Sequence, residues 1–178
     1  MTLNMEREDG LRYPARAIVD TNVILNVALG KMDNLPATCL DRSKRLLDDA
    51  ISGQFELLLP SIALIELSSD HIIHADGNPT KRQYKEMKHK VMQWCEDSTL
   101  DFADLTLPAA EWYHDNTSIQ CIRPIDSAIL ATAKYANATV VYSWDDKFIE
   151  FVKKANATAS IGISVRHPPE CPITLFDE

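Results

Sequence analysis

The chain has 178 residues, of which 46% are hydrophobic and 25% charged, so it is long and apolar enough for one domain with its own core. A net charge of −8 argues against binding nucleic acid with the whole surface, and four scattered cysteines without a Cys-x-x-Cys pair argue against a zinc site or disulfide framework. No apolar run is long enough to cross a bilayer, and the N-terminus has no apolar signal segment. We therefore expect a cytoplasmic protein with no membrane partner.

Strands and helices are predicted to alternate along the chain. Short runs of β-branched and aliphatic residues predict strands at residues 15–19, 55–59, 139–142 and 161–165, and a further short strand within residues 100–107. Apolar residues at helical spacing predict helices at residues 23–30, 36–53, 61–67, 108–116 and 124–135, and another after the acidic turn at 143–146. This alternation favours an α/β fold: a single three-layer α/β/α domain over residues 15–178 with a mostly parallel sheet, after a flexible N-terminal segment at residues 1–14.

The segment at residues 68–99 departs from the alternation. It contains a turn cluster, Asp-Gly-Asn-Pro, followed by a polar helix at residues 81–96. We interpret it as a helical excursion within the domain. Its basic side chains form either a solvated helix face or a lid that contacts substrate phosphates, and the candidate substrate-binding residues are Lys81, Arg82, Lys85 and Lys88.

Four acidic residues follow predicted strand ends or lie in helices beside them, namely Asp20, Glu66, Asp126 and Asp145. Because the carboxyl ends of parallel strands meet at one edge of a sheet, we expect these side chains to lie close together. Two carboxylates about 4 Å apart repel by about 4 kcal/mol at an effective dielectric constant near 20, so protons, basic groups or cations must compensate. Oxygen ligands suit Mg²⁺ or Mn²⁺, which can polarise a phosphodiester and activate water.

Several of these residues also have plainer interpretations. Asp20 could cap the following helix, and Asp126 could interact with a helix dipole. Glu66 could lie on the surface or in an ion pair. Trp144, beside the last acid, could stack on a nucleic-acid base or pack in the core.

The acids stand in four motifs in a familiar order. These are DTNVIL at residues 20–25, PSIALIELS around Glu66, PIDSAILATA around Asp126, and SWDDKF at residues 143–148. Over about residues 15–151 the chain resembles PIN-domain ribonucleases, including the VapC-type toxins of toxin–antitoxin pairs. The resemblance implies a PIN-like fold and an endoribonuclease that hydrolyses RNA with Mg²⁺ or Mn²⁺.

The same resemblance implies roles for individual residues. Asp20, Asp126 and Asp145 would hold the metal ion, and Glu66 would position a second ion or the attacking water, so all four are catalytic candidates. Three accessory candidates accompany them. Asn22 falls on the small polar position after the first acid, Ser143 replaces the commoner threonine before the last acid, and Asp146 is an extra ligand or a bystander.

Partners follow from the resemblance as well. RNA is the expected substrate, a VapC-like toxin would have an antitoxin protein, and we expect a homodimer. The apolar faces of the first helices could pair with a second copy, with an inhibitor helix or with the core, and the sequence leaves these three open.

Three other functions compete with this one. A haloacid-dehalogenase-like phosphatase would use Asp20, Ser61 and the pair at 145–146, but it needs an aspartate where Asn22 stands. A flap-type DNA nuclease would need a helix-hairpin-helix, which the sequence does not suggest. A degenerate PIN domain could serve RNA processing as an interaction module without cleaving RNA.

Overall fold

The computed structural model describes residues 13–30, 35–67 and 81–170. Most of the predicted flexible segment at 1–14, and residues 68–80 of the predicted excursion, therefore lie outside the described residues. Tyr13 is buried, because its ring stacks on Phe55 at a centroid distance of 4.3 Å and its hydroxyl group donates a hydrogen bond to Asp49 Oδ2 at 2.6 Å. The packed part of the chain thus includes Tyr13, two residues before the predicted domain boundary.

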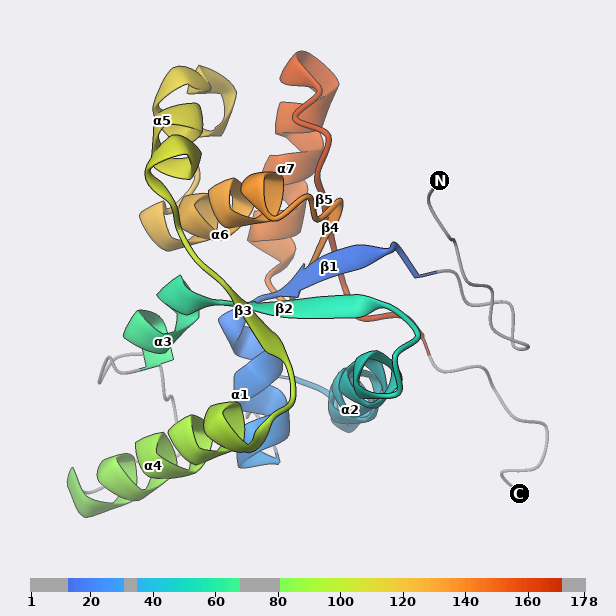
Figure 1. Cartoon of the computed structure of the whole chain (residues 1–178), viewed down its shortest axis with the longest axis vertical. Helices are drawn as coiled ribbons and strands as arrows, with labels where there is room; N and C mark the ends of the chain where they lie inside the picture. The colour runs from blue at the N-terminus through green and yellow to red at the C-terminus, as the bar shows by residue number, and fades with distance from the viewer. Residues whose placement is uncertain (1–12, 31–34, 68–80, 171–178) are drawn as a thin grey trace.

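Five parallel strands form a single sheet in the order β3-β2-β1-β4-β5 (Figure 1). The strands are β1 (Arg16–Val19), β2 (Glu56–Pro60), β3 (Asp101–Ala103), β4 (Val140–Tyr142) and β5 (Ser164–Arg166). In the central strand, Ile18 lies opposite Leu58 on one side and Val141 on the other. Every pairing between the described strands is parallel, which confirms the predicted sheet.

Helices cover both faces of the sheet and give three layers, as predicted (Figure 1). One face carries α1 (Thr21–Leu29), α2 (Ala37–Ile51) and α4 (Lys81–Asp97), and the other carries α5 (Leu107–Asp115), α6 (Pro124–Tyr135), the short helix η1 (Thr117–Ile119) and α7 (Asp146–Ala159). Helix α3 (Ser61–Leu67) continues directly from β2 and contacts α4 and α6. Within the described residues, no helix combines the length and apolarity needed to span a membrane.

The two halves of the core follow from the alternation of side chains along each strand. In β1, Ala17 and Val19 pack in the core that includes α1 and α2, whereas Ile18 packs in the core that includes α6 and α7. A strand buried on both faces needs a continuous apolar run, which is what the sequence supplies in β1, β2 and β4. The sheet is thereby held on both faces, and its carboxyl edge is left to the polar residues that follow the strands.

The short strand predicted within residues 100–107 is β3, which comprises Asp101–Ala103. Thr106 is the N-cap of α5, and its hydroxyl oxygen accepts a hydrogen bond from the Ala109 amide at 3.4 Å. Pro108 occupies the first turn of α5, where it needs no amide donor. The capping residue and the proline therefore start α5 at Leu107, shortly after the strand.

Candidate active site

The four acids lie at the carboxyl ends of three neighbouring strands. Asp20 directly follows β1, Glu66 lies in the helix after β2, and Asp145 follows β4. Asp126 lies in the first turn of α6, which contacts both β1 and β4. Residues from four separate motifs are thus gathered at one edge of the sheet, as the strand ends predicted.

Asp20 is buried and points toward the end of β4. Its Oδ2 atom accepts hydrogen bonds from the Ser143 hydroxyl at 2.6 Å and from the Asn22 side-chain amide at 2.8 Å. Asp20 occupies the N-cap position of α1, but its side chain makes no capping hydrogen bond. The capping interpretation is therefore wrong for this carboxylate, which serves the contact between β1 and β4 instead.

Burial, together with the neighbouring acidic charges, favours the protonated form of Asp20. Burial raises the pKa of Asp20 from 3.8 to about 7, the Ser143 hydrogen bond opposes this rise, and the charges of Glu66 and Asp126 add to it. Burial also raises the pKa of Asp126, although Arg123 opposes the rise. A cation bound beside these carboxylates would favour their ionised forms.

Asn22 and Ser143 join the ends of β1 and β4. The Asn22 Nδ2 atom also donates to Ser143 Oγ at 3.0 Å, and its Oδ1 atom accepts from the Trp144 amide at 3.0 Å. Ser143 is fully buried, and its Oγ atom accepts a further hydrogen bond from the Asp145 amide at 3.0 Å. These two accessory candidates therefore fix the position of Asp20 relative to Asp145.

The two carboxylate oxygens of Asp145 have different partners. Oδ1 caps α7 by accepting hydrogen bonds from the amides of Lys147 at 2.9 Å and Phe148 at 3.2 Å. Oδ2 accepts a hydrogen bond from the terminal guanidinium nitrogen of Arg123. Asp145 is therefore at once a structural cap and a member of the acidic cluster.

Arg123 joins two of the acids and was not predicted. Its Nε atom donates to Asp126 Oδ2 at 2.8 Å, while its terminal nitrogen reaches Asp145. The available signal was an arginine directly before a helix and three residues before an acid. A cation at that place opposes the helix dipole, so it suggests a role other than stabilising the helix.

Glu66 is oriented by Thr21, the residue after the first acid. The Thr21 hydroxyl group donates to Glu66 Oε2 at 2.5 Å. Among the described residues Glu66 has no ion pair, so its main partner is this buried hydroxyl group. Thr21 was also missed, although it stands between two recognised polar positions of the DTN sequence.

The donor atoms suit a hard divalent cation better than a transition metal, because carboxylates, hydroxyls and an amide surround the buried Asp20. As they stand, however, no three Asp, Glu, His or Cys side chains in the described part of the chain converge closely enough to hold an ion. Arg123 occupies Oδ2 of both Asp126 and Asp145. The residues fit the ion in their chemistry, and movement of Arg123 would free two of the ligand atoms.

The family of this fold follows from its sequence. A PIN domain model matches residues 17–154, which run from β1 into α7 and include all four acids. The chain belongs to the PIN-domain family. PIN domains are generally nucleases, and they generally use divalent metal ions.

Solved structures share the fold of this PIN domain. It resembles the crystal structure of FitAcB from Neisseria gonorrhoeae with a TM-score of 0.55 and 21% identity, over 85% of this chain and 97% of that one. It resembles the structure of FitAB bound to an IR36 DNA fragment with a TM-score of 0.53 and 19% identity, over 85% of this chain and 94% of that one. No significant sequence match to a curated protein is found.

The side chains of two further predicted residues of the PIN domain make their contacts away from Asp20. Asp146 is exposed, and its Oδ1 atom lies 3.0 Å from His167 Nε2. Trp144 is buried in the core, and its indole nitrogen donates to Ser43 Oγ at 2.9 Å. Core packing is therefore the interpretation of Trp144 that the structure confirms.

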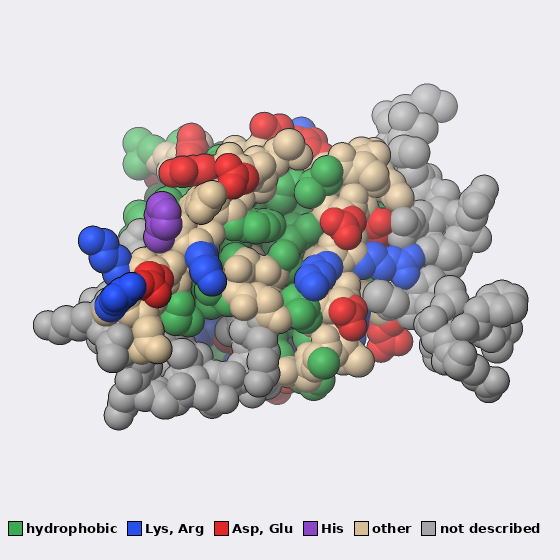
Figure 2. Space-filling view, turned by 90° about the horizontal axis from the view of Figure 1, so that it is seen from below, with side chains coloured by type: hydrophobic (Ala, Val, Ile, Leu, Met, Phe, Trp, Pro, Cys, Tyr) green, Lys and Arg blue, Asp and Glu red, His purple; other side chains and the backbone are tan. Residues whose placement is uncertain are grey.

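The basic residues predicted to bind substrate lie on α4, which packs against α1 and α3. Figure 2 shows Lys, Arg and one His side chain toward the left of the view, the side to which α4 extends in Figure 1. Arg82 pairs with Glu86 at 2.8 Å, and Lys85 is exposed. The side chain of Lys81 lies outside the described ones, Lys88 is half-buried, and a role for these residues toward substrate stays a prediction.

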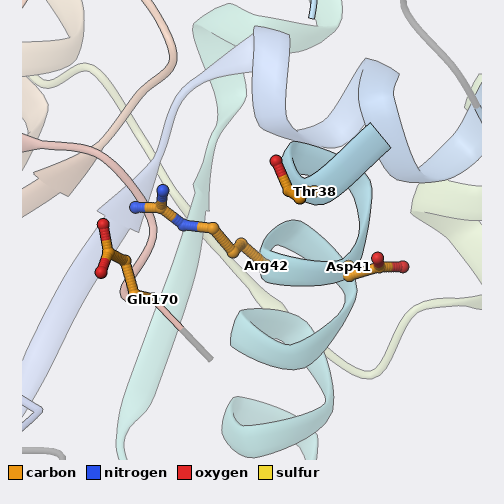
Figure 3. A pocket seen from close by; sticks show the side chains of 4 residues that line it. All are labelled: Thr38, Asp41, Arg42 and Glu170. Atoms are coloured by element: carbon orange, nitrogen blue, oxygen red, sulfur yellow. The ribbon is translucent and has the colours of Figure 1, made fainter. Parts of the chain in front are cut away.

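A pocket of about 340 Å³ lies elsewhere in the PIN domain, between α2 and the segment after β5 (Figure 3). Its lining residues are Thr38, Asp41, Arg42 and Glu170. Figure 3 shows Arg42 reaching from α2 toward Glu170, whereas Asp41 points away. None of the four acids lines this pocket, so it is separate from the candidate active site.

Proposed function

We propose that this PIN domain is an endoribonuclease that hydrolyses RNA phosphodiester bonds with Mg²⁺ or Mn²⁺. The observation that carries the proposal is the setting of Asp20, which is buried, has neutral hydrogen-bond donors and lies within the field of Glu66 and Asp126. Burial disfavours the ionised form of a carboxylate, and groups whose pKa is raised in this way, here toward 7, concentrate at functional sites. The family match supports a nuclease over a phosphatase.

Asp20, Asp126 and Asp145 would hold the ion in this proposal. When bound, the divalent cation supplies Lewis-acid polarisation of the phosphate and an activated water. Asn22 and Ser143 would keep Asp20 facing the ion, because they fix its Oδ2 atom. Glu66, held by Thr21, would orient the attacking water.

Cleavage of a labelled single-stranded RNA tests the proposal. Wild type should cleave the RNA when Mn²⁺ is present, and cleavage should stop when a chelator is added. Asp20→Asn and Asp126→Asn should each lower the cleavage rate at least about a hundredfold. Asp146→Asn is the matched control, because it removes the same charge from an exposed residue outside the Asp20 network. Its rate should remain close to that of wild type.

The same preparation separates the competing functions. Equal cleavage by wild type, Asp20→Asn and Asp126→Asn would show that the activity comes from elsewhere. Hydrolysis of an aryl phosphate, lost in Asp20→Asn, would favour the phosphatase, and cleavage of flapped duplex DNA would favour a DNA nuclease. RNA binding without cleavage would favour a PIN domain that serves as an interaction module.

We also propose an antitoxin partner and a homodimer. The resemblance to VapC-type toxins supports the first, and the fold shared with FitAB is compatible with it. Expression in a bacterial host should arrest growth, Asp20→Asn should not, and co-expression of the product of an adjacent gene should restore growth. Light scattering of the purified chain should give twice the monomer mass, and a monomer mass would exclude the dimer.

A further inference from the structure

Arg123 neutralises two acids that lie on different elements. Asp126 belongs to α6 and Asp145 caps α7, yet one guanidinium group binds Oδ2 of both. In the described part of the chain, both of the ion pairs made by the four acids involve this arginine. Arg123 therefore occupies the electrostatic place that a cation would take between α6 and α7.

The contact with Asp145 uses the oxygen that a metal ion would need. Oδ1 of Asp145 is committed to the amides of Lys147 and Phe148 at the start of α7. Oδ2 is the oxygen that remains for a ligand, and it is bound to Arg123. A divalent cation at this oxygen would repel the guanidinium group, so the two cannot both hold it closely.

Arg123 is also placed so that it can leave. Its side chain is 67% exposed, whereas those of Asp126 and Asp145 are 10% and 23% exposed. Exposed ion pairs are weak, and Arg123 stands at the N-cap of α6, where the helix dipole disfavours a cation. Solvent competes for the exposed guanidinium group and the dipole of α6 disfavours it, so the group is only weakly held in its present position.

We propose that Arg123 holds Asp126 and Asp145 in the metal-free protein, that a divalent cation displaces it, and that the released guanidinium group then binds a phosphate of the RNA. This inference rests on the proposed function for its substrate. A guanidinium group at the rim of the site can offer two parallel N–H donors to a phosphate. Arg123 would thus act as a positioning residue, because its guanidinium group would leave the carboxylates of Asp126 and Asp145 and bind a phosphate of the RNA.

The first test is Mn²⁺ binding without RNA, measured by the paramagnetic resonance of free Mn²⁺. Arg123→Gln should bind Mn²⁺ about tenfold more tightly than wild type, the combined value of two ion pairs whose arginine is exposed to solvent. Arg123→Lys keeps the charge and should stay near wild type. Lys154→Gln is the matched control, because Lys154 is 68% exposed, pairs with Glu150 and carries the same charge; it should leave Mn²⁺ binding unchanged.

The second test is RNA affinity, measured by fluorescence anisotropy with Mn²⁺ in a Glu66→Gln background that slows turnover. Adding Arg123→Gln should weaken binding about tenfold and reduce the slope of log affinity against log salt by about 0.7, as expected for one lost phosphate contact to a single strand. Adding Lys154→Gln should change neither quantity.

The outcomes of the two tests are separable from those of the cleavage assay. Mn²⁺ affinity that is the same in Arg123→Gln and wild type, or is raised equally by Lys154→Gln, overturns the displacement of Arg123. RNA affinity and salt slope unchanged by Arg123→Gln overturn the phosphate contact. If Mn²⁺ binding tightens but wild type cleaves no RNA, the displacement stands and the proposed function fails.

Discussion

The hydroxyl group of Ser143 donates a 2.6 Å hydrogen bond to Asp20, a residue 123 positions earlier in the chain. The bond links the ends of β1 and β4, and the same Ser143 oxygen accepts hydrogen bonds from Asn22 and from the Asp145 amide. One buried oxygen atom therefore sets the spacing of the first and last acids of the site.

Removing that oxygen should destabilise the fold. Ser143→Ala leaves the Asp145 amide without its buried acceptor and removes one of the two acceptors of the Asn22 side-chain amide, which costs roughly 1–3 kcal/mol. Urea unfolding measures this change. Ser143→Thr retains the hydroxyl group and should lose much less; equal losses in the two variants would show that packing, and not the hydrogen bonds, makes Ser143 important.

The metal-free protein should become less stable as pH rises from about 4 to 7. The pKa of Asp20 is about 7 in the folded chain against 3.8, so the folded state binds the extra proton in this interval. This proton stabilises the folded state fully below pH 3.8, and its contribution is lost as pH rises through 7. The resulting decrease in the free energy of unfolding is on the order of 4 kcal/mol in total.

Thermal unfolding of wild type and Asp20→Asn, in chelator at a series of pH values, isolates this contribution. Asp20→Asn lacks the titrating group, so its melting temperature should rise relative to wild type as the pH approaches 7 and above. Adding Mn²⁺ should restore the stability of the wild-type protein at the upper end of this pH range. A difference between the two proteins that does not vary with pH would contradict the raised pKa.

Two substitutions of Asp145 should separate its role as the N-cap of α7 from its proposed role as a metal ligand. Asn can still accept the amide hydrogens of Lys147 and Phe148, whereas Ala cannot. We expect Asp145→Ala to be less stable than Asp145→Asn by about 1 kcal/mol, the usual value of an N-cap, and both to lose RNA cleavage. Urea unfolding and the cleavage assay measure the two parts, and equal stabilities would mean that the cap contributes little.

Thr21→Val should reduce turnover while leaving the fold nearly unchanged. Valine has the shape of threonine and fills the same buried space, but it cannot donate to Glu66 Oε2. We expect kcat for RNA cleavage to fall about tenfold, KM to change little and unfolding free energy to change by less than about 1 kcal/mol. Thr21→Ser, which keeps the donor, should retain most activity, and a normal kcat in Thr21→Val would remove the role given to Thr21.

The sheet and its edge could be predicted because they depend on local patterns. The apolar runs of β1 and β4 identify strands buried on both faces, and an acid within three residues of each strand end places Asp20 and Asp145 at one edge. A short strand within residues 100–107 was predicted as well, but not its bounds, because Thr106 and Pro108 start α5 at Leu107. That competition between a strand and a helix cap is difficult to weigh from a short apolar run.

The partners of the acids could not be predicted in the same way. Arg123 meets Asp145 across 22 residues, and Thr21 meets Glu66 across 45, so neither contact lies within one helix or strand and each depends on how separate elements pack. The motifs name the acids and two of their neutral partners, Asn22 and Ser143, but not Arg123 or Thr21. Asp126 is the partial exception, since its arginine lies three residues before it on the same helix start.

The two carboxylate oxygens of Asp145 have different roles, and this difference affects how the protein could change in evolution. A single nucleotide substitution converts an aspartate codon to one for asparagine, which would keep the capped end of α7 and remove a charge from the proposed metal site. An inert descendant with an undamaged architecture is therefore one step away. In relatives of this chain, overall shape alone will not separate active nucleases from inactive ones, and the residue that caps the start of the last helix should be inspected first.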